Sequence, residues 1–259
     1  MFDTFEIKMR SVASSAVQQK VITRRGREGS ATAFKTVAPI EFLIDQIRPQ
    51  INRDIATVAY WGAGRIEAVL WLTDRDVQGD FIRFRKAHSK TKRYHQVPKS
   101  GLLAQYLAGS EFAPGYLFPA KGKKGRKTQR YFYRTDEQGQ RQKLKGTTYD
   151  RPVRTASGFD YALGQAVQRI MCDGDPGIDA QIAAIPEIQR LGRGAFFGVS
   201  SHTFRRSQAQ YLFYTLDWEA TEVMQITGHR SLDAFYHYID FHGKDLVERM
   251  QAITRAIVQ

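Results

Sequence analysis

The stretch Ser200–Phe241 constrains the chain most, because it joins helical spacing to four chemically unusual side chains. His202 and Arg205 stand three residues apart, so on a helix they lie on one face and can contact the same group. Farther along, His229 follows a glycine of the kind that ends helices, and Tyr238 comes nine residues later. A guanidinium matches a phosphate in a two-pronged geometry, and a phenol can attack phosphorus to form a phosphotyrosine ester. The stretch therefore indicates chemistry on a phosphate.

Two basic residues upstream extend this pattern. Taken alone, each feature is weak, because a histidine or tyrosine on an amphipathic helix is more often packed or exposed than catalytic, and H-x-x-R arises by chance. Arg65 begins a predicted helix in the run GAGRIEA, and Lys90 lies in a predicted turn before the pair Val97-Pro98, with Lys92 as the alternative. The weight lies in the ordered set of basic, imidazole and phenol groups.

In order and spacing, these residues resemble the motifs of the tyrosine recombinase (phage integrase) family over roughly residues 36–245. The family's helix start T-G-x-R-I-x-E aligns with Arg65, and Leu72, Asp76 and Val77 match its L-x-x-x-D-I ending. One departure is Glu67, which stands one residue before the family's glutamate position. The residues that align with catalytic positions are Arg65, Lys90, His202, Arg205, His229 and Tyr238.

The resemblance implies a fold that is mainly α with a small β-sheet (α+β), and a strand-transfer reaction on DNA. Tyr238 would attack a backbone phosphate, form a 3′-phosphotyrosyl bond and free a 5′-hydroxyl. Arg65 and Arg205 would neutralise the non-bridging oxygens. Because the intermediate keeps the phosphate ester energy, no metal and no cofactor is expected.

The resemblance also assigns the remaining groups. Lys90 would protonate the leaving 5′-oxygen, His202 would assist proton transfer at the tyrosine, and His229 would hydrogen-bond the phosphate. Tyr236 is the rival nucleophile, but it lies two residues from Tyr238 and faces another way on a helix. The other histidines receive no catalytic role: His88 and His95 on the predicted hairpin, and His237 and His242 at the surface or behind the site.

Composition agrees with a nucleic-acid partner. The net charge is +13 and the pI is near 9.9, which favours a polyanion. Cys172 is the only cysteine, which excludes an internal disulfide and a cysteine-based zinc site. The sequence has no run of eighteen apolar residues and its first residues lack an apolar signal region. We therefore expect a cytoplasmic protein, associated with the nucleoid when bound to DNA.

A basic insertion at residues 121–151 interleaves lysines and arginines with aromatic residues. This composition suits contact with a nucleic-acid backbone and some stacking. A β-hairpin with strands near 129–134 and 140–145 is expected, and a solvated loop is the alternative. The predicted DNA-binding residues are Lys121, Lys123, Lys124, Arg126, Lys127, Arg130, Lys92 and Arg93.

Periodicity predicts most of the remaining elements. Core positions are expected at Ile66, Val69, Leu70 and Leu72, and Asp217 is expected to cap a helix. No element is predicted for the Gly-, Pro- and Ile-rich residues 173–199. The expected helices span 38–60 with a break near Pro49, 65–72, 101–109, 157–171, 201–216, 219–227 and from Ser231 or Leu232 onward, and the expected strands span 80–86 and 93–97.

The predicted domain layout has three parts. Residues 1–35 form a short basic arm, residues 36–245 form the catalytic domain, and residues 246–259 form a terminal helix. The arm is a partial clamp on DNA, a clamp that a partner completes, or a flexible tail. The terminal helix docks on a neighbouring protomer, as in the family, or packs on its own domain.

Two other functions are compatible with parts of the pattern. A type IB topoisomerase-like nicking-closing enzyme shares the phosphotyrosine chemistry but lacks a histidine at the position of His202. A non-catalytic DNA-binding protein would not need the full set of groups. Within recombinases, integration, resolution and inversion share these residues, and the short N-terminal arm favours a resolvase or invertase. The family resemblance further implies a homotetramer on specific double-stranded DNA sites, with an accessory DNA-bending protein as a possible partner and no membrane.

Overall fold

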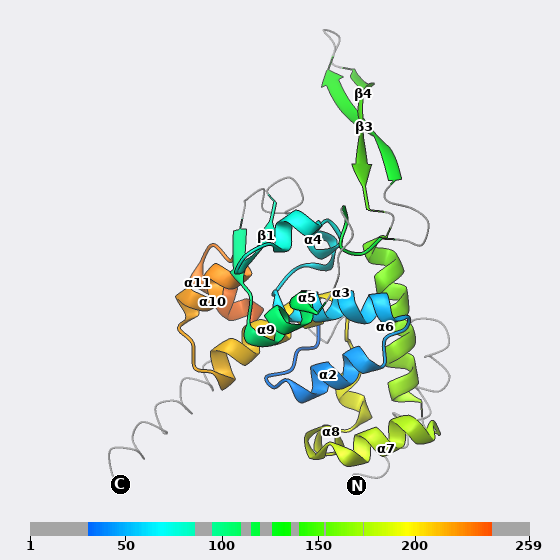
Figure 1. Cartoon of the computed structure of the whole chain (residues 1–259), viewed down its shortest axis with the longest axis vertical. Coiled ribbons are helices and arrows are strands. Elements are labelled where there is room, and N and C mark those ends of the chain that lie inside the picture. Colours follow the sequence, from blue (N-terminus) through cyan, green and yellow to red (C-terminus); the bar gives the residue numbers. More distant parts are fainter. Residues whose placement is uncertain are drawn as a thin grey trace.

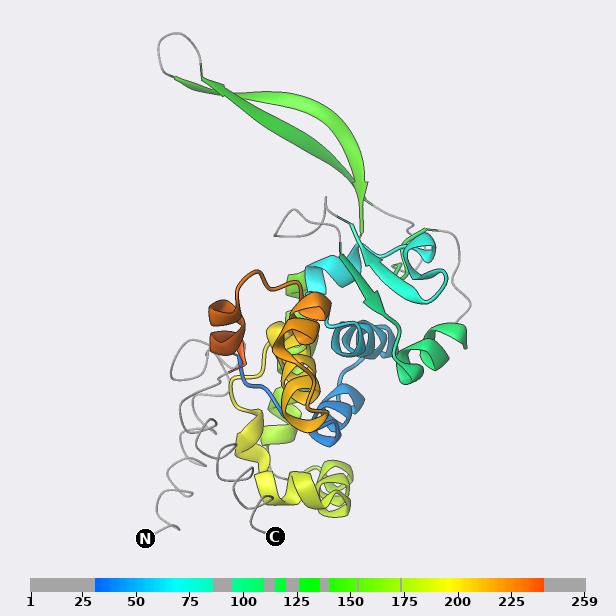
Figure 2. The same ribbon diagram turned by 90° about the vertical axis from the view of Figure 1, so that its left-hand side faces the viewer.

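The computed structural model describes residues 31–85, 95–109, 115–119, 126–135, 140–152, 154–172 and 174–239. Within them, helices form a body from which a long two-stranded hairpin projects (Figures 1 and 2). The fold is mainly α with a small β component, which confirms the predicted class. The helices are α2 (Ala38–Asp45), α3 (Gln50–Trp61), α4 (Ile66–Leu70), α5 (Gly101–Ala108), α6 (Ala156–Met171), α7 (Pro176–Ala184), α8 (Pro186–Leu191), α9 (Ser201–Gln210), α10 (Ala220–Thr227) and α11 (Leu232–Tyr238).

Short helical turns and two antiparallel strand pairs complete the described elements. Strand β1 pairs with β2 in the register Phe81↔Pro98 to Phe84↔His95, and β3 pairs with β4 with a register irregularity between Gln129 and Tyr131. The turns are η1 (Asp74–Val77), η3 (Arg193–Phe196) and the π-helical η4 (Tyr211–Thr215), and the strands are β1 (Phe81–Phe84), β2 (His95–Pro98), β3 (Arg126–Thr135) and β4 (Arg141–Arg151).

Helix α3 lies at the centre of the main hydrophobic core. It packs against α2, α4, α5 and α9. Its apolar residues recur with helical spacing, so the buried stripe faces several neighbours at once. Solvent is excluded from Ile55, Ala56, Val58, Ala59 and Tyr60. The predicted core residues Ile66, Val69, Leu70 and Leu72 are also buried, which confirms that assignment.

Helix α9 is buried although most of its residues are polar. Every residue from Thr203 to Gln210 is buried, including two adjacent arginines. Ser200 caps its first turn by accepting from the backbone N–H of His202, and Thr203 completes a reciprocal capping pair. A polar helix remains buried only if its side chains find partners, so the contacts of α9 organise the site described below.

A second, smaller apolar cluster holds α10 and α11 against the end of α9. Phe213 makes an edge-on contact with Phe235, with ring centroids 5.8 Å apart. Phe235 and Ile239, the residue that follows α11, are four residues apart and therefore lie on the same face. Together they anchor this face of the helix in the cluster. The buried members of the cluster are Ala209, Leu212, Phe213, Ala220, Val223, Phe235 and Ile239.

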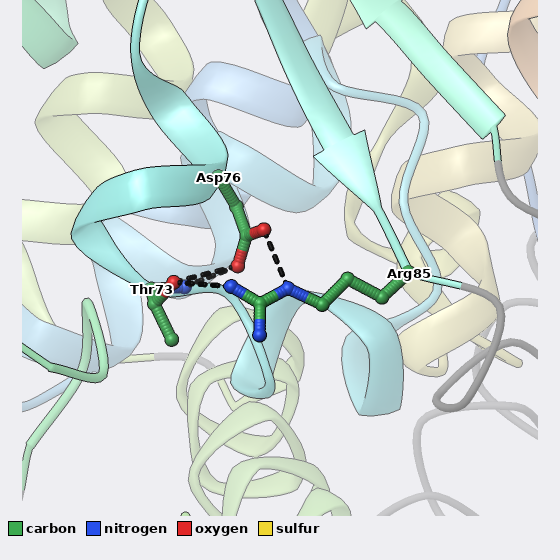
Figure 3. A network of polar contacts seen from close by, with 3 residues as sticks. All are labelled: Thr73, Asp76 and Arg85. Carbon is green, nitrogen blue, oxygen red and sulfur yellow. Dashed lines mark hydrogen bonds and ion pairs between the residues drawn. The ribbon is translucent and has the colours of Figure 1, made fainter.

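The β1–β2 hairpin is fastened to the turn after α4 by three polar side chains (Figure 3). Asp76 accepts from the backbone N–H of Thr73 at 2.9 Å and from its hydroxyl at 2.7 Å. The other carboxylate oxygen pairs with Nε of Arg85 at 2.7 Å. Arg85 also donates to the Thr73 hydroxyl at 2.9 Å. The network fixes the end of β1, after which the segment bearing Lys90 begins.

Three sequence predictions need correction. Residues 173–199 contain α7, α8 and η3, which were missed because few positions turn inward; Ile178 and Ile188 are the buried residues of α7 and α8. Asp217 does not cap α10: it has a φ of 53°, and Glu219 is the cap residue, paired with Glu222. The helix expected over 65–72 is confined to Ile66–Leu70.

The hairpin of the insertion is longer than predicted, and the other predicted elements lie where expected, with shifted ends. Within the part of the chain that the structure describes, none of the helices combines the length and apolar character that a bilayer crossing requires.

Removing the Asp76 carboxylate should destabilise the protein more than removing its exposed partner. Asp76→Ala deletes a capping pair and leaves the partly buried donors of Thr73 without their carboxylate partner, which should cost about 2 kcal/mol. Arg85→Ala deletes only the half-exposed cation, with an expected loss below about 1 kcal/mol. Urea unfolding of both variants measures the difference, and equal losses would contradict the network in Figure 3.

Candidate active site

Arg205 is the buried centre of the candidate site. Its side chain extends from α9, and the residue is only 3% exposed. One terminal nitrogen donates to the carbonyl of Ala63 at 2.7 Å, and the other donates to the carbonyl of Thr227 at the end of α10. The Nε atom is buried without a hydrogen-bond partner. Burial lowers the Arg205 pKa to about 10, so the group keeps its positive charge at neutral pH.

The turn Gly62–Gly64 presents its backbone to Arg205 and leads to Arg65. Ala63 has a φ of 45°, a strained conformation for a residue with a side chain. A β-carbon on Gly64 would lie 2.7 Å from a Val69 methyl carbon and 2.9 Å from the Phe84 ring. Glycine is therefore required for the turn to pack against α4 and β1, and the packed turn places Arg65 at the start of α4, half-buried.

Tyr238 is the last residue of α11, and its hydroxyl points into the protein. The Oη atom is buried and has no partner that satisfies hydrogen-bond geometry. Burial raises the pKa of the phenol, while the positive charges of Arg205, Arg65 and Arg206 oppose the rise. The phenol and the Arg205 guanidinium thus lie close enough to influence each other strongly, yet each retains an unpartnered polar atom.

His229 lies against Tyr238, with ring centroids 4.5 Å apart. Gly228 ends α10 with a φ of 66° and turns the chain so that the imidazole reaches this position. Burial, and then the charges of Arg205 and Arg65, lower the His229 pKa to about 4. The imidazole is therefore neutral at neutral pH.

The tautomer of His229 follows from its hydrogen bonds. Nδ1 lies 2.7 Å from the hydroxyl oxygen of Thr227, and that hydroxyl donates its only hydrogen to the carbonyl of Val223 at 2.8 Å. Nδ1 must therefore carry the proton and donate to Thr227. In the neutral ring, Nε2 is then an acceptor.

His95 is a site neighbour that the sequence analysis left without a role. From β2, its Nε2–H donates to the carbonyl of Ile226 at 2.7 Å, and its ring stacks on Phe84 with centroids 5.1 Å apart. Burial lowers the His95 pKa, and the charges of Arg205 and Arg65 act in the same direction. The residue joins the β1–β2 hairpin to α10, and no family motif marked it.

His202 differs from the buried groups in its exposure. It stands in the first turn of α9 and is exposed. Its charge acts on Asp160 of α6, whose pKa is raised by burial and held back by Ser201 and His202. The structure therefore gathers Arg65, Arg205, His229 and Tyr238, and places His202 at the rim beside Asp160.

Several predicted residues lie outside the described part of the chain, and others are placed only by backbone. Strand register sets Tyr131 opposite Lys145 and Tyr133 opposite Lys143, and both lysines are exposed. Arg126, Lys127 and Arg130 belong to β3. The predicted residues outside the described ranges are Lys90, Lys92, Arg93, Lys121, Lys123 and Lys124.

The rival tyrosine and the other predicted histidines are also accounted for where the structure describes them. Tyr236 packs against Phe213, with ring centroids 6.3 Å apart, on a different side of α11 from the buried phenol. His237 is exposed. His88 and His242 lie outside the described residues. Among the described residues, no group of three or more His, Cys, Asp or Glu side chains is arranged to hold a metal ion.

Comparison with known proteins shows a distant likeness to solved structures. No family model matches the chain, and a search of curated proteins finds no match. Among solved structures, the chain is similar to the Tn1549 transposon integrase (residues 82–397) in complex with circular intermediate DNA. The TM-score is 0.49 and the identity is 14%, over 97% of this chain and 79% of that one.

The lowered pKa values of His229 and His95 predict weaker folding in mild acid. A histidine whose folded pKa lies below its unfolded value stabilises the fold above the unfolded pKa, near 6.5, and that stability is lost as pH falls towards the folded pKa. The unfolding free energy should therefore fall between about pH 6.5 and pH 4. Denaturant unfolding across this range should show a shallower decline for His229→Gln than for wild type, and identical slopes would contradict the buried neutral imidazole.

Proposed function

We propose that the chain is a site-specific DNA recombinase of the tyrosine recombinase family, which cuts and rejoins DNA through a 3′-phosphotyrosyl intermediate. Tyr238 Oη bonds to the phosphorus of a backbone phosphodiester, and the bond from phosphorus to the 5′-oxygen breaks. The 5′-hydroxyl of a second strand then attacks the phosphotyrosine and releases the phenol. The single observation that carries this proposal is that two interacting side chains, Arg205 and Tyr238, each keep a buried polar atom without a hydrogen-bond partner, Nε and Oη.

A phosphate fits the needs of these two atoms. A buried polar group without a partner costs free energy, and a non-bridging phosphate oxygen would accept from Arg205 Nε. The phosphorus would then lie beside the phenol oxygen. Arg65, half-buried at the start of α4, supplies a second cation for the charge that develops in the pentacovalent transition state.

The same charges control the protonation of His229. Burial, and then the charges of the cations Arg205 and Arg65, lower the His229 pKa to about 4. A bound phosphate offsets those cations, so it raises the His229 pKa towards its ordinary value. Nε2 is the free acceptor of the neutral ring and becomes a donor once protonated. His229 can thus hydrogen-bond the phosphate in its protonated form.

The remaining roles follow the family resemblance. Lys90, or Lys92 in its place, protonates the leaving 5′-oxygen from the segment after β1. His202 assists proton transfer from the rim of the site. The reaction needs no metal and no cofactor. We further propose a cytoplasmic enzyme that acts as a homotetramer on two DNA sites, with residues 1–35 as a basic arm and residues 246–259 as a docking helix.

The projecting β3–β4 hairpin is proposed as a DNA contact. Its register places Tyr131 and Tyr133 opposite the exposed Lys145 and Lys143, and lysines interleaved with aromatic residues suit contact with a nucleic-acid backbone. The net charge of +13 supplies the general attraction. Lys121, Lys123 and Lys124 precede this hairpin in the sequence and belong to the same proposed contact.

A covalent trap tests the chemistry. Wild-type protein and supercoiled DNA carrying its native flanking region are mixed without metal and quenched with detergent. We expect a protein–DNA adduct that Tyr238→Phe abolishes and that Tyr236→Phe, the matched control two residues away, retains. Loss in both variants, or persistence in Tyr238→Phe, would remove Tyr238 as the nucleophile. Tight binding with no adduct in wild type would favour a non-catalytic DNA-binding role.

Replacing Arg205 should slow adduct formation while DNA binding persists. Losing one charged contact to the transition state costs about 3 kcal/mol, or roughly a hundredfold in rate. Arg205→Lys keeps a cation but loses the fork that bridges Ala63 and Thr227, so single-turnover cleavage should fall by at least this factor. A Lys variant that cleaves at the wild-type rate would show that the guanidinium is dispensable.

Charge removal on β4 should weaken DNA binding in a salt-dependent way. The slope of log K against log salt is negative. Lys143→Gln or Lys145→Gln should each reduce its magnitude by about 0.9 if the lysine pairs with a phosphate. Arg190→Gln, which removes the same charge from exposed α8 at the far end of the molecule (Figure 1), serves as the control. Equal slopes for all three variants would rule out the hairpin contact.

A further inference from the structure

We propose that Arg206, the neighbour of Arg205, is the positioning residue for Tyr238. Arg206 donates to the backbone carbonyl of Tyr238, while the positive charge of Arg205 lies near the phenol. Two consecutive residues of α9 therefore interact with opposite ends of the same residue. The kinetic consequence rests on the proposed function, whereas the structural consequence stands without it.

The first observation is a pair of hydrogen bonds from α9 to the end of α11. Arg206 Nε donates to the carbonyl of Tyr238 at 2.6 Å. One turn later on the same face of α9, Gln210 Nε2 donates to the carbonyl of Ile239 at 3.0 Å. The last carbonyls of a helix have no partner inside the helix. Here two side chains from another helix satisfy them and fix where α11 ends.

The second observation is the burial of the guanidinium. Arg206 is 4% exposed, and its Nε and one terminal nitrogen donate to backbone carbonyls. A buried cation is costly unless its donors are used, and the negative end of a helix dipole favours a cation. The Arg206 guanidinium carbon also lies 6.0 Å from the centroid of the Tyr238 ring. The residue is thus committed to Tyr238 at both its backbone and its ring.

The third observation is a link to the segment Ala31–Thr36, which crosses α9. Arg206 also donates to the carbonyl of Ala31. The segment is held further by the backbone N–H of Phe34, which donates to the Ser207 hydroxyl at 2.9 Å. The Phe34 ring packs on Phe196 at 5.3 Å. Arg206 therefore lies between a fixed segment and α11, and cannot shift without breaking one of these contacts.

Apolar packing alone leaves α11 under-determined. Phe235 and Ile239 anchor one face of the helix, but apolar contacts are non-directional. A phenol must lie within a fraction of an ångström of its attack position, and a misplacement of about 1 Å can cost a hundredfold in rate. The directional bonds of Arg206 supply the missing constraint, and they place the phenol in the site formed by its own chain.

The kinetic test compares Arg206→Met with Arg169→Met. Arg169 is a partly buried arginine that also donates to a backbone carbonyl, that of Gln46, on the α6 side of the molecule. At saturating DNA, we expect adduct formation by Arg206→Met to fall about a hundredfold, with the DNA dissociation constant within about twofold of wild type. Arg169→Met should cleave at the wild-type rate. Arg206→Lys, which can still donate one hydrogen bond, should recover part of the rate.

Wild-type cleavage speed in Arg206→Met would overturn the proposal. An equal loss in Arg169→Met, measured below the unfolding temperature of both variants, would also overturn it, because the effect would then reflect general destabilisation.

A second measurement keeps the inference separate from the proposed reaction. With 3-fluorotyrosine incorporated in place of tyrosine, the resonance of residue 238 is assigned by its absence in Tyr238→Phe. In the free protein, Arg206→Met should shift or broaden this fluorine line, and Arg169→Met should leave it unchanged. An unchanged line in Arg206→Met would overturn the positioning role even if the protein cleaves DNA. A changed line without any adduct in wild type would uphold that role and reject the recombinase chemistry.

Discussion

The burial of two adjacent guanidinium groups on α9 is the constraint on which the rest of the site depends. Arg205 and Arg206 are 3% and 4% exposed, and each needs acceptors inside the protein. Those acceptors are main-chain carbonyls from the turn after α3, the end of α10, the end of α11 and the segment before α2. Four parts of the chain are thereby held around one polar helix, so the contacts that stabilise the fold also shape the site.

Burial and electrostatics set the protonation of this arrangement. Burial and the positive charges of Arg205 and Arg65 keep His229 neutral, and the two charges oppose the rise that burial causes in the pKa of Tyr238. The site therefore holds positive charge beside a phenol and a neutral imidazole. In the proposed reaction, a bound phosphate would offset that charge and change the proton affinity of both groups, so phosphate binding and protonation would be coupled.

Sequence patterns predicted the parts of the fold that repeat or carry a motif. Spacing along the chain was enough to find two of these features. They are the buried helical stripe around Ile55 and the ordered motif residues Arg65, Arg205, His229 and Tyr238. Helices α7 and α8 were missed, since each buries a single isoleucine and shows little periodicity. The roles of Arg206 and His95 were unpredictable, because both depend on carbonyls distant in sequence, at Tyr238 and Ile226.

The contact between Arg206 and Ala31 links the segment before α2 directly to Tyr238, the candidate nucleophile. The Arg206 guanidinium donates to the carbonyls of both Ala31 and Tyr238, so a displacement of one carbonyl acts on the other. A shift of the segment at Ala31 would therefore act on the end of α11 directly, and not only through the apolar packing around Phe235. The position of the tyrosine thus depends on the Ala31 segment as well as on α11.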